Sequence, residues 1–306
     1  MRAFVGVTDI NWFNYLASLQ NIDEVNFWQP SGKSLFQALN PGELFLFKLR
    51  SPLNVIVGGG FFAHSTVVPI NLAWDAFQEK NGAPSFIEMR KQIDKLRKAS
   101  GVVNYNIGCI LLEQPFFFGR NEWIPAPGDW KPNIVKGKTY DLSKSFGREL
   151  FNQVQTRLLA KKLIRDVASE AQGARYGAPT TILPRLGQGS FRVIVTDAYQ
   201  RKCAITRERT LPALEAAHIK PFKCEGPHRI NNGILMRSDI HRLFDTGYVT
   251  ITEDHRFEVS RRIREEYLNG RDYYAMNGKV IDIPSYPSFK PASEFIRWHN
   301  ENVFRG

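Results

Sequence analysis

The chain has 306 residues, a formal net charge of +11 and a hydrophobic content of 43%. It is long enough for two domains with separate cores, and no run of about 18 apolar residues predicts a transmembrane helix. We expect no secretory leader and a reducing cytoplasmic location, because the three cysteines (Cys109, Cys203 and Cys224) are widely spaced and odd in number. The absence of any CxxC pair excludes a four-cysteine zinc site.

The positive charge is concentrated in the second half of the chain. Residues 1–140 contain 14 Lys and Arg against 11 Asp and Glu, whereas residues 141–306 contain 27 against 19. A basic surface favours a polyanionic partner through phosphate contacts and counterion release. Charge alone is equally compatible with a basic protein that binds no nucleic acid.

The first 140 residues are predicted to be rich in strands, with helices inserted between them. A first strand near residues 4–7 is followed by a short helix over 11–19. Residues 44–49 and 55–62 are apolar runs joined by a polar turn, which is typical of a hairpin. Helical spacing over residues 70–80 and 85–98 predicts two helices. A β-branched and aromatic run over residues 107–118 predicts a strand.

A boundary region and a long helix are predicted between two domains. Residues 126–138 are rich in Pro, Gly and Lys, and residues 146–170 have the spacing of one amphipathic helix. A loop over 173–189 and a helix over 190–199 are expected next. The predicted organisation is a target-recognition domain (1–140), a linker helix and loop (141–180) and a second domain (181–306).

The most informative pattern is His218, Asn232 and His241. His218 lies on a short apolar run that Pro221 ends, as the first strand of a hairpin would. Asn232 precedes Gly233 in a predicted turn, and His241 lies on a predicted helix over residues 234–244. Phosphodiester hydrolysis needs a neutral base to deprotonate water, together with positive charge to stabilise the phosphorane and the leaving oxygen.

The His–Asn–His order and spacing resemble the HNH nuclease motif, a hairpin followed by a helix around one divalent metal ion. Residues 184–251 resemble the HNH domains of bacterial predicted restriction endonucleases, through GQGSFRVIVTDAYQRKCAIT, LEAAHI and NGILMRSDIHRLFDTG. The resemblance implies that His218 is the general base, that Asn232 sets the hairpin geometry and helps to orient the base, and that His241 is a metal ligand. It implies Mg²⁺ or Mn²⁺ as the cofactor, and the absent cysteine pairs predict no structural zinc.

Two further metal-ligand candidates, Asp245 and Glu215, follow from their spacing. Asp245 lies four residues after His241 and therefore on the same helix face, although it could instead cap the helix. Many HNH nucleases have a ligand where this chain has Ala217, so either Glu215 or water fills that position. Three arginines are candidates for phosphate contacts, although each one alone is more often a solvated charge; they are Arg192, Arg237 and Arg242.

The N-terminal region carries a second resemblance. NPGELFLF followed by VIVGGG resembles the strand pair of PUA-like domains, including the EVE and ASCH groups, which are small β-barrels that read nucleic acid or a modified base. Trp12 and Trp28 are the candidate walls of a modified-base pocket, and Asn26 and Gln29 are candidates for its hydrogen bonds. The alternative is that these aromatic side chains form the barrel core.

These observations predict an α+β protein with an N-terminal PUA-like β-barrel domain, a linker helix and a C-terminal ββα-metal (HNH) nuclease domain. The predicted function is a metal-dependent DNA endonuclease of the restriction type, in which the N-terminal domain reads a modified base. The alternative is a nucleic-acid-binding PUA-like protein with a degenerate HNH module, which the Ala217 position favours. The expected partner is double-stranded DNA, with no membrane, and a homodimer is left open.

Overall fold

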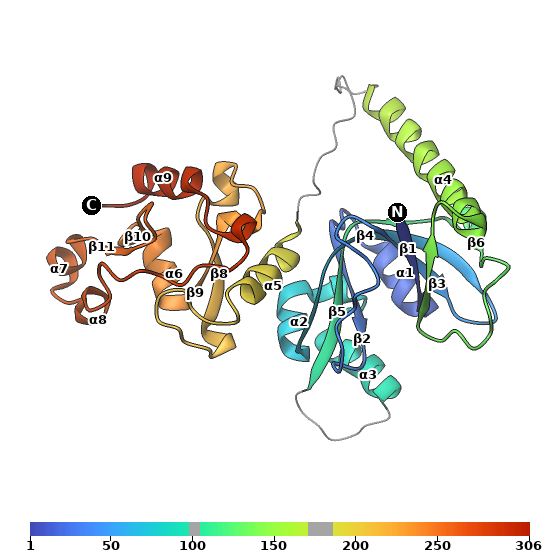
Figure 1. The fold of residues 1–306 in the computed structure, drawn as a ribbon, viewed down its shortest axis with the longest axis horizontal. Helices are drawn as coiled ribbons and strands as arrows, with labels where there is room; N and C mark the ends of the chain where they lie inside the picture. The colour runs from blue at the N-terminus through green and yellow to red at the C-terminus, as the bar shows by residue number, and fades with distance from the viewer. Residues whose placement is uncertain (98–104, 171–185) are drawn as a thin grey trace. The chain divides into compact units, whose positions relative to one another are not determined.

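The computed structural model describes residues 1–97, 105–170 and 186–306, without the side chains of residues 161–170. The predicted loop over 173–189 therefore lies mostly outside the described residues. The chain divides into two compact units, Met1–Pro184 and Arg185–Gly306 (Figure 1). Among the described residues, no helix combines the length and the apolar character needed to cross a membrane.

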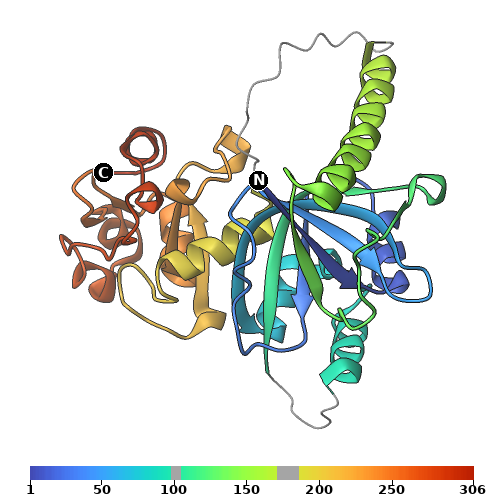
Figure 2. The ribbon, with the colours of Figure 1, turned by 45° about the vertical axis from the view of Figure 1, so that its right-hand side comes forward.

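The N-terminal unit is built on one seven-stranded sheet (Figure 2). The strand order is β2–β5–β4–β3–β1–β7, and β6 pairs with β4. β1 and β3 are parallel, whereas the other pairs are antiparallel. In chain order the strands are β1 (Arg2–Thr8), β2 (Glu24–Gln29), β3 (Leu44–Leu49), β4 (Val55–Pro69), β5 (Asn106–Phe117), β6 (Ile124–Pro125) and β7 (Gly137–Asp141).

The sheet does not close into the predicted barrel. β2 and β7 are the two ends of the order and do not pair with each other within the described residues. β4 is unusually long, and its register with β5 shifts after Gly59 and again after Phe62. A Cβ atom added at Gly58 would lie 2.3 Å from the carbonyl oxygen of Phe116, so the backbones approach too closely there for any other residue. The α+β class is confirmed, with a curved open sheet in place of a closed barrel.

The N-terminal helices agree with the predicted spacing. They are α1 (Ile10–Ser18), α2 (Ile70–Phe77), α3 (Phe86–Arg97) and α4 (Ser145–Glu170). Asp9 caps α1, because its carboxylate accepts a hydrogen bond from the backbone N–H of Trp12 at 2.9 Å. Leu150 and Val154 of α4 belong to a core cluster with residues of β1 and β3. The first half of the predicted linker helix is therefore part of the N-terminal unit.

The C-terminal unit is a small mixture of helices and two-stranded sheets. Its elements are α5 (Gln188–Ala198), β8 (Leu214–His218), β9 (Gly233–Arg237), α6 (Ser238–Asp245), β10 (Val249–Ile251), β11 (Phe257–Val259), α7 (Arg262–Tyr267), α8 (Arg271–Tyr274) and α9 (Ser293–Asn302). The helix predicted over 234–244 is wrong in its first part, because residues 233–237 form a strand antiparallel to β8. Ile234, Leu235 and Met236 are all buried, and a short apolar run does not distinguish a buried strand from a helix.

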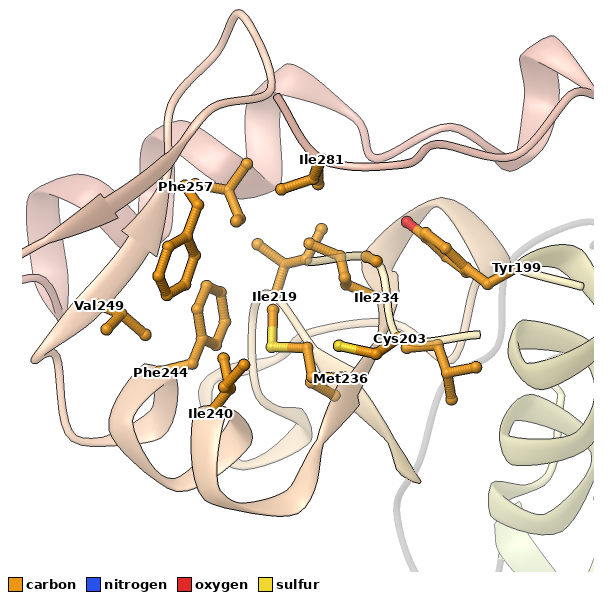
Figure 3. Close-up of a cluster of buried hydrophobic side chains, with 14 of the residues drawn as sticks. Tyr199, Cys203, Ile219, Ile234, Met236, Ile240, Phe244, Val249, Phe257 and Ile281 are labelled. Carbon is orange, nitrogen blue, oxygen red and sulfur yellow. The ribbon is translucent and has the colours of Figure 1, made fainter. Parts of the chain in front are cut away.

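One apolar cluster supports the hairpin and α6. Figure 3 shows Ile234 and Met236 of β9 gathered with Ile240 and Phe244 of α6 and with Phe257 of β11. All of these side chains are at most 1% exposed. Because the cluster includes both strands of the hairpin and the following helix, it sets how their polar side chains face one another.

Candidate active site

His218 is the last residue of β8 and lies opposite Gly233 of β9. The ring of Phe191 stacks on its imidazole, with centroids 3.8 Å apart and planes 10° apart. Burial, followed by the charges of His228 and His241, lowers the pKa of His218 from 6.5 to about 4. The imidazole is therefore neutral at neutral pH, as a general base must be.

A second histidine, His228, contacts the first directly. Nε2 of His218 and Nδ1 of His228 are 2.9 Å apart, and Phe222 stacks on the His228 ring. Nδ1 of His218 has no hydrogen-bond partner among the described residues. His228 was not predicted as a site residue because it lies in an irregular loop; its only signal is a histidine between the two strands of a predicted hairpin.

Asn232 is fully buried and closes that loop. Its side-chain oxygen accepts a hydrogen bond from the backbone N–H of Lys220, and its side-chain nitrogen donates to the carbonyl oxygens of Lys220 and Pro227, each at 2.9 Å. The backbone N–H of Ile219 donates to the carbonyl of Asn232. These bonds hold the segment between His218 and His228, so Asn232 acts on the histidine pair through the backbone.

His241 lies between two carboxylates. Its Nδ1 is 2.6 Å from Oε2 of Glu215, and its Nε2 is 3.4 Å from Oδ2 of Asp245. Burial raises the pKa of the Asp245 carboxyl, the charges of His241 and Lys223 oppose this, and the charge of Glu215 adds a smaller increase. Within the described ranges, no group of three His, Cys, Asp or Glu side chains is arranged to hold a metal ion. Ala217 is buried and contributes no polar group.

His218, Glu215, His241 and Asp245 share a pocket of about 380 Å³. Its lining includes the stacked pair of Phe191 and His218, the carboxylates beside His241, and Arg192 from α5; the complete lining is Gln188, Phe191, Arg192, Glu215, Ala216, His218, Pro221, Phe222, His241 and Asp245. The sequence therefore anticipated five of these ten residues, and Phe191 was hidden because it is an apolar helix position like any other.

The other two arginines are placed differently. Arg237 lies at the end of β9, not on the helix, and its guanidinium donates two hydrogen bonds of 2.7 Å to the carboxylate of Asp239. This placement corrects the expectation that Arg237 lies on the predicted helix over residues 234–244. Arg242 is exposed on α6 and does not line the pocket.

The predicted modified-base pocket is not formed by its four candidate residues. Trp12, Asn26 and Trp28 are buried, and both indole N–H groups donate to the carbonyl of Asn81 at 3.0 and 2.9 Å. Asn26 donates to the side chain of Asn81. Gln29 is the half-buried last residue of β2. A base could not stack between Trp12 and Trp28 in this structure, because their faces are covered by the core.

Comparison with known proteins identifies the C-terminal segment. Residues 203–252 match the HNH endonuclease family HNH_2, so the predicted HNH domain is confirmed and this part of the chain is of the nuclease class. No curated protein matches the chain.

Two solved structures are similar at low identity. An ASCH protein from Zymomonas mobilis is 11% identical with a TM-score of 0.34, over 49% of this chain and 94% of its own. A modification-dependent TagI restriction endonuclease is 13% identical with a TM-score of 0.30, over 97% of this chain and 81% of its own. At these identities and TM-scores, neither likeness carries an argument about function.

Proposed function

We propose that this chain, which contains an HNH endonuclease domain over residues 203–252, is a metal-dependent endonuclease that hydrolyses phosphodiester bonds in double-stranded DNA. The observation that supports the proposal is the state of His218. Its ring is neutral, its Nδ1 lacks a partner among the described residues, and it shares a pocket with Glu215, His241 and Asp245.

In the proposed reaction, Nδ1 of His218 accepts a proton from water. The water oxygen forms a bond to phosphorus, and the bond between phosphorus and the leaving nucleotide oxygen breaks. Nε2–H of His218 donates to Nδ1 of His228, so the charge that develops on the first ring is stabilised by the second. Asn232 positions both histidines by closing the loop between them.

The donor chemistry beside His218 fits a hard divalent ion. Two carboxylates flank one imidazole, and carboxylate oxygens are the donors that such an ion prefers. We propose that Glu215, His241 and Asp245 supply the ligands for Mg²⁺ or Mn²⁺ and that they rearrange to do so, because within the described ranges they are not arranged as a metal site: the two carboxylates contact opposite ring nitrogens of His241. When bound, such an ion neutralises charge on the phosphorane and stabilises the leaving oxygen.

We propose that the N-terminal unit selects the DNA target and that the selected feature is a modified base. The whole chain would then act as a restriction enzyme. The separation of the chain into two compact units supports a division between selection and cleavage. Buried Ala217 instead favours the alternative of a degenerate HNH module that binds without cleaving.

A nicking assay with Mg²⁺ or Mn²⁺, on plasmids prepared from hosts with different base modifications, distinguishes the two functions. The His218→Ala variant is expected to lose about 10²-fold or more in cleavage rate while DNA binding stays nearly unchanged, because the base acts on water and not on the duplex. His255→Asn, at a histidine outside the pocket lining, is the matched control. No nicking by the wild-type protein with either metal would favour the degenerate module, and wild-type rates in His218→Ala would remove the assigned base.

A further inference from the structure

The N-terminal unit contains a cavity of about 820 Å³ that includes none of the predicted base-pocket residues. It lies where β1 and β3 end, beside the proline-rich segment that precedes β7. The volume is in the range typical of small-molecule sites, roughly 300–1,000 Å³. Its lining includes Lys48, Arg50, Asn54 and Trp130.

Lys48 places a buried cation against this cavity. The residue is 2% exposed, and its ammonium donates to the carbonyl of Leu49 at 3.0 Å and to Oδ1 of Asn54 at 2.8 Å. The same ammonium lies 4.7 Å from the ring centroid of Trp130. Burial lowers the pKa of the Lys48 amine.

No carboxylate among the described residues pairs with Lys48. Asp129, which precedes Trp130 in the chain, is instead engaged by Lys138 and Tyr140. A buried cation without a counter-charge costs free energy, and an anionic ligand would offset that cost.

Arg50 adds a second cation at the same cavity. It follows β3 and is exposed, and its guanidinium has no hydrogen bond or ion pair among the described residues. A guanidinium of this kind matches the geometry of a phosphate. Trp130 and the neighbouring prolines supply the flat apolar surface on which a heterocycle stacks.

We propose that this cavity binds a nucleotide, with the phosphate on Arg50 and the base against Trp130, above the floor that Lys48 and Asn54 form. The nucleotide is either extruded from DNA, in which case the inference rests on the proposed function and locates its target-recognition site, or free in solution. Both sources share one chemistry, a planar heterocycle that carries a phosphate.

Calorimetry on the full chain tests this binding with free deoxynucleoside monophosphates, the matching nucleosides, and short duplexes with and without a mismatched base. Arg50→Gln is expected to weaken nucleotide binding by about tenfold and to leave nucleoside binding unchanged. Trp130→Ala is expected to weaken both by on the order of 10- to 100-fold, and Trp130→Phe to restore most of the loss. Lys95→Gln, which removes one exposed charge on α3, is the control.

The outcomes distinguish an extruded nucleotide from a free one, and they distinguish failure of this inference from failure of the proposed nuclease function. Sensitivity of mismatched-duplex binding to Trp130→Ala assigns the cavity to an extruded nucleotide, and sensitivity of mononucleotide binding alone assigns it to a free one. If neither probe responds to Arg50→Gln or Trp130→Ala, the cavity is not a nucleotide site. Plasmid nicking is measured in parallel, so a chain that nicks normally while both variants bind like wild type overturns this inference and leaves the proposed nuclease intact.

Discussion

At the scale of single residues, the tautomer adopted at the contact between His218 and His228 decides which ring nitrogen of the proposed base is available. When Nε2–H of His218 donates to Nδ1 of His228, the lone pair of His218 lies on Nδ1, the atom without a partner among the described residues. The opposite tautomer would place the lone pair against His228 and a proton where the base must accept one. His228 is therefore a positioning residue for the proposed base.

Two variants of His228 separate this role from packing. His228→Asn retains an acceptor near the position of Nδ1, whereas His228→Phe retains the stack on Phe222 and loses the acceptor. We expect His228→Phe to lower kcat by about 10- to 100-fold and His228→Asn to recover most of it, with DNA affinity unchanged in both. Nitrogen chemical shifts of the His218 ring report the tautomer without any cleavage assay. An Nδ1–H tautomer in the wild-type protein would contradict the assignment.

The proposed metal ligands make a separate prediction. Glu215→Gln, His241→Ala and Asp245→Asn are each expected to weaken Mn²⁺ binding by about tenfold or more, because each removes one donor from the same small site. Calorimetric titration of the full chain measures the affinity, and Glu258→Gln, at the exposed position of β11, is the control. If the three ligand variants bind Mn²⁺ as tightly as the Glu258→Gln control, these residues do not hold the metal.

At the scale of elements, α5 and β9 together hold the His218 ring. A Cβ atom added at Gly233 would lie 2.9 Å from Cζ of Phe191 and 2.6 Å from Cγ2 of Val195. Glycine is needed here for close packing rather than for an unusual backbone conformation. The absence of a side chain on β9 lets Phe191 reach the imidazole, so the strand and the helix determine the orientation of the base jointly.

Gly233→Ala is accordingly expected to displace Phe191. We expect a loss of about 1–3 kcal/mol in the free energy of unfolding and about tenfold in kcat, as overpacking moves the stacked pair. Urea denaturation and steady-state nicking measure the two effects. Gly128→Ala is the control, since its added methyl group would meet nothing closer than 3.4 Å. Unchanged nicking in Gly233→Ala would show that the stack does not orient the base.

At the scale of the whole molecule, each unit contains a buried titratable group, and the two have opposite effects on stability. Burial, followed by the charge of Glu24, raises the pKa of Glu113 in β5 from 4.5 to about 7. Burial lowers the pKa of His299 in α9 from 6.5 to about 4, although its hydrogen bond to the Phe244 carbonyl opposes this. Both side chains are neutral in the folded protein over the range between these values.

The difference in pKa between the folded and the unfolded chain determines how each group changes stability with pH. Between pH 4.5 and 7 the unfolded chain loses the Glu113 proton that the folded chain retains, so this group reduces stability as pH rises. Between pH 6.5 and 4 the unfolded chain binds a proton that folded His299 does not, so this group reduces stability as pH falls. Each effect is on the order of 3 kcal/mol at its limit.

Scanning calorimetry of the full chain from pH 4 to 8 measures both effects. Glu113→Gln is expected to remove the loss of stability toward pH 7, and His299→Gln to remove the loss toward pH 4, at the cost of some packing on Phe244. If Glu113→Gln has the same pH dependence as the wild-type protein, Glu113 is already ionised in the folded state.

The sequence by itself placed His218 on the first strand of a hairpin and His241 on the helix that follows, with Asn232 between them. It could do so because hairpin and helix spacing are local properties that a short segment encodes. It also indicated the α+β class and the strand-rich first half. Only the tertiary structure decided that residues 233–237 pair as a strand, that His228 meets His218, and that Arg237 is engaged by Asp239.

The same holds for the N-terminal aromatic residues. The sequence indicates that Trp12 and Trp28 are available for stacking, but it does not show which ring faces the core covers. Burial depends on contacts between segments that are distant in the chain, such as the bonds from Trp12 and Trp28 to the carbonyl of Asn81. Trp130 lines a cavity because the proline-rich segment before β7 lies against the ends of β1 and β3, a proximity that no local pattern records.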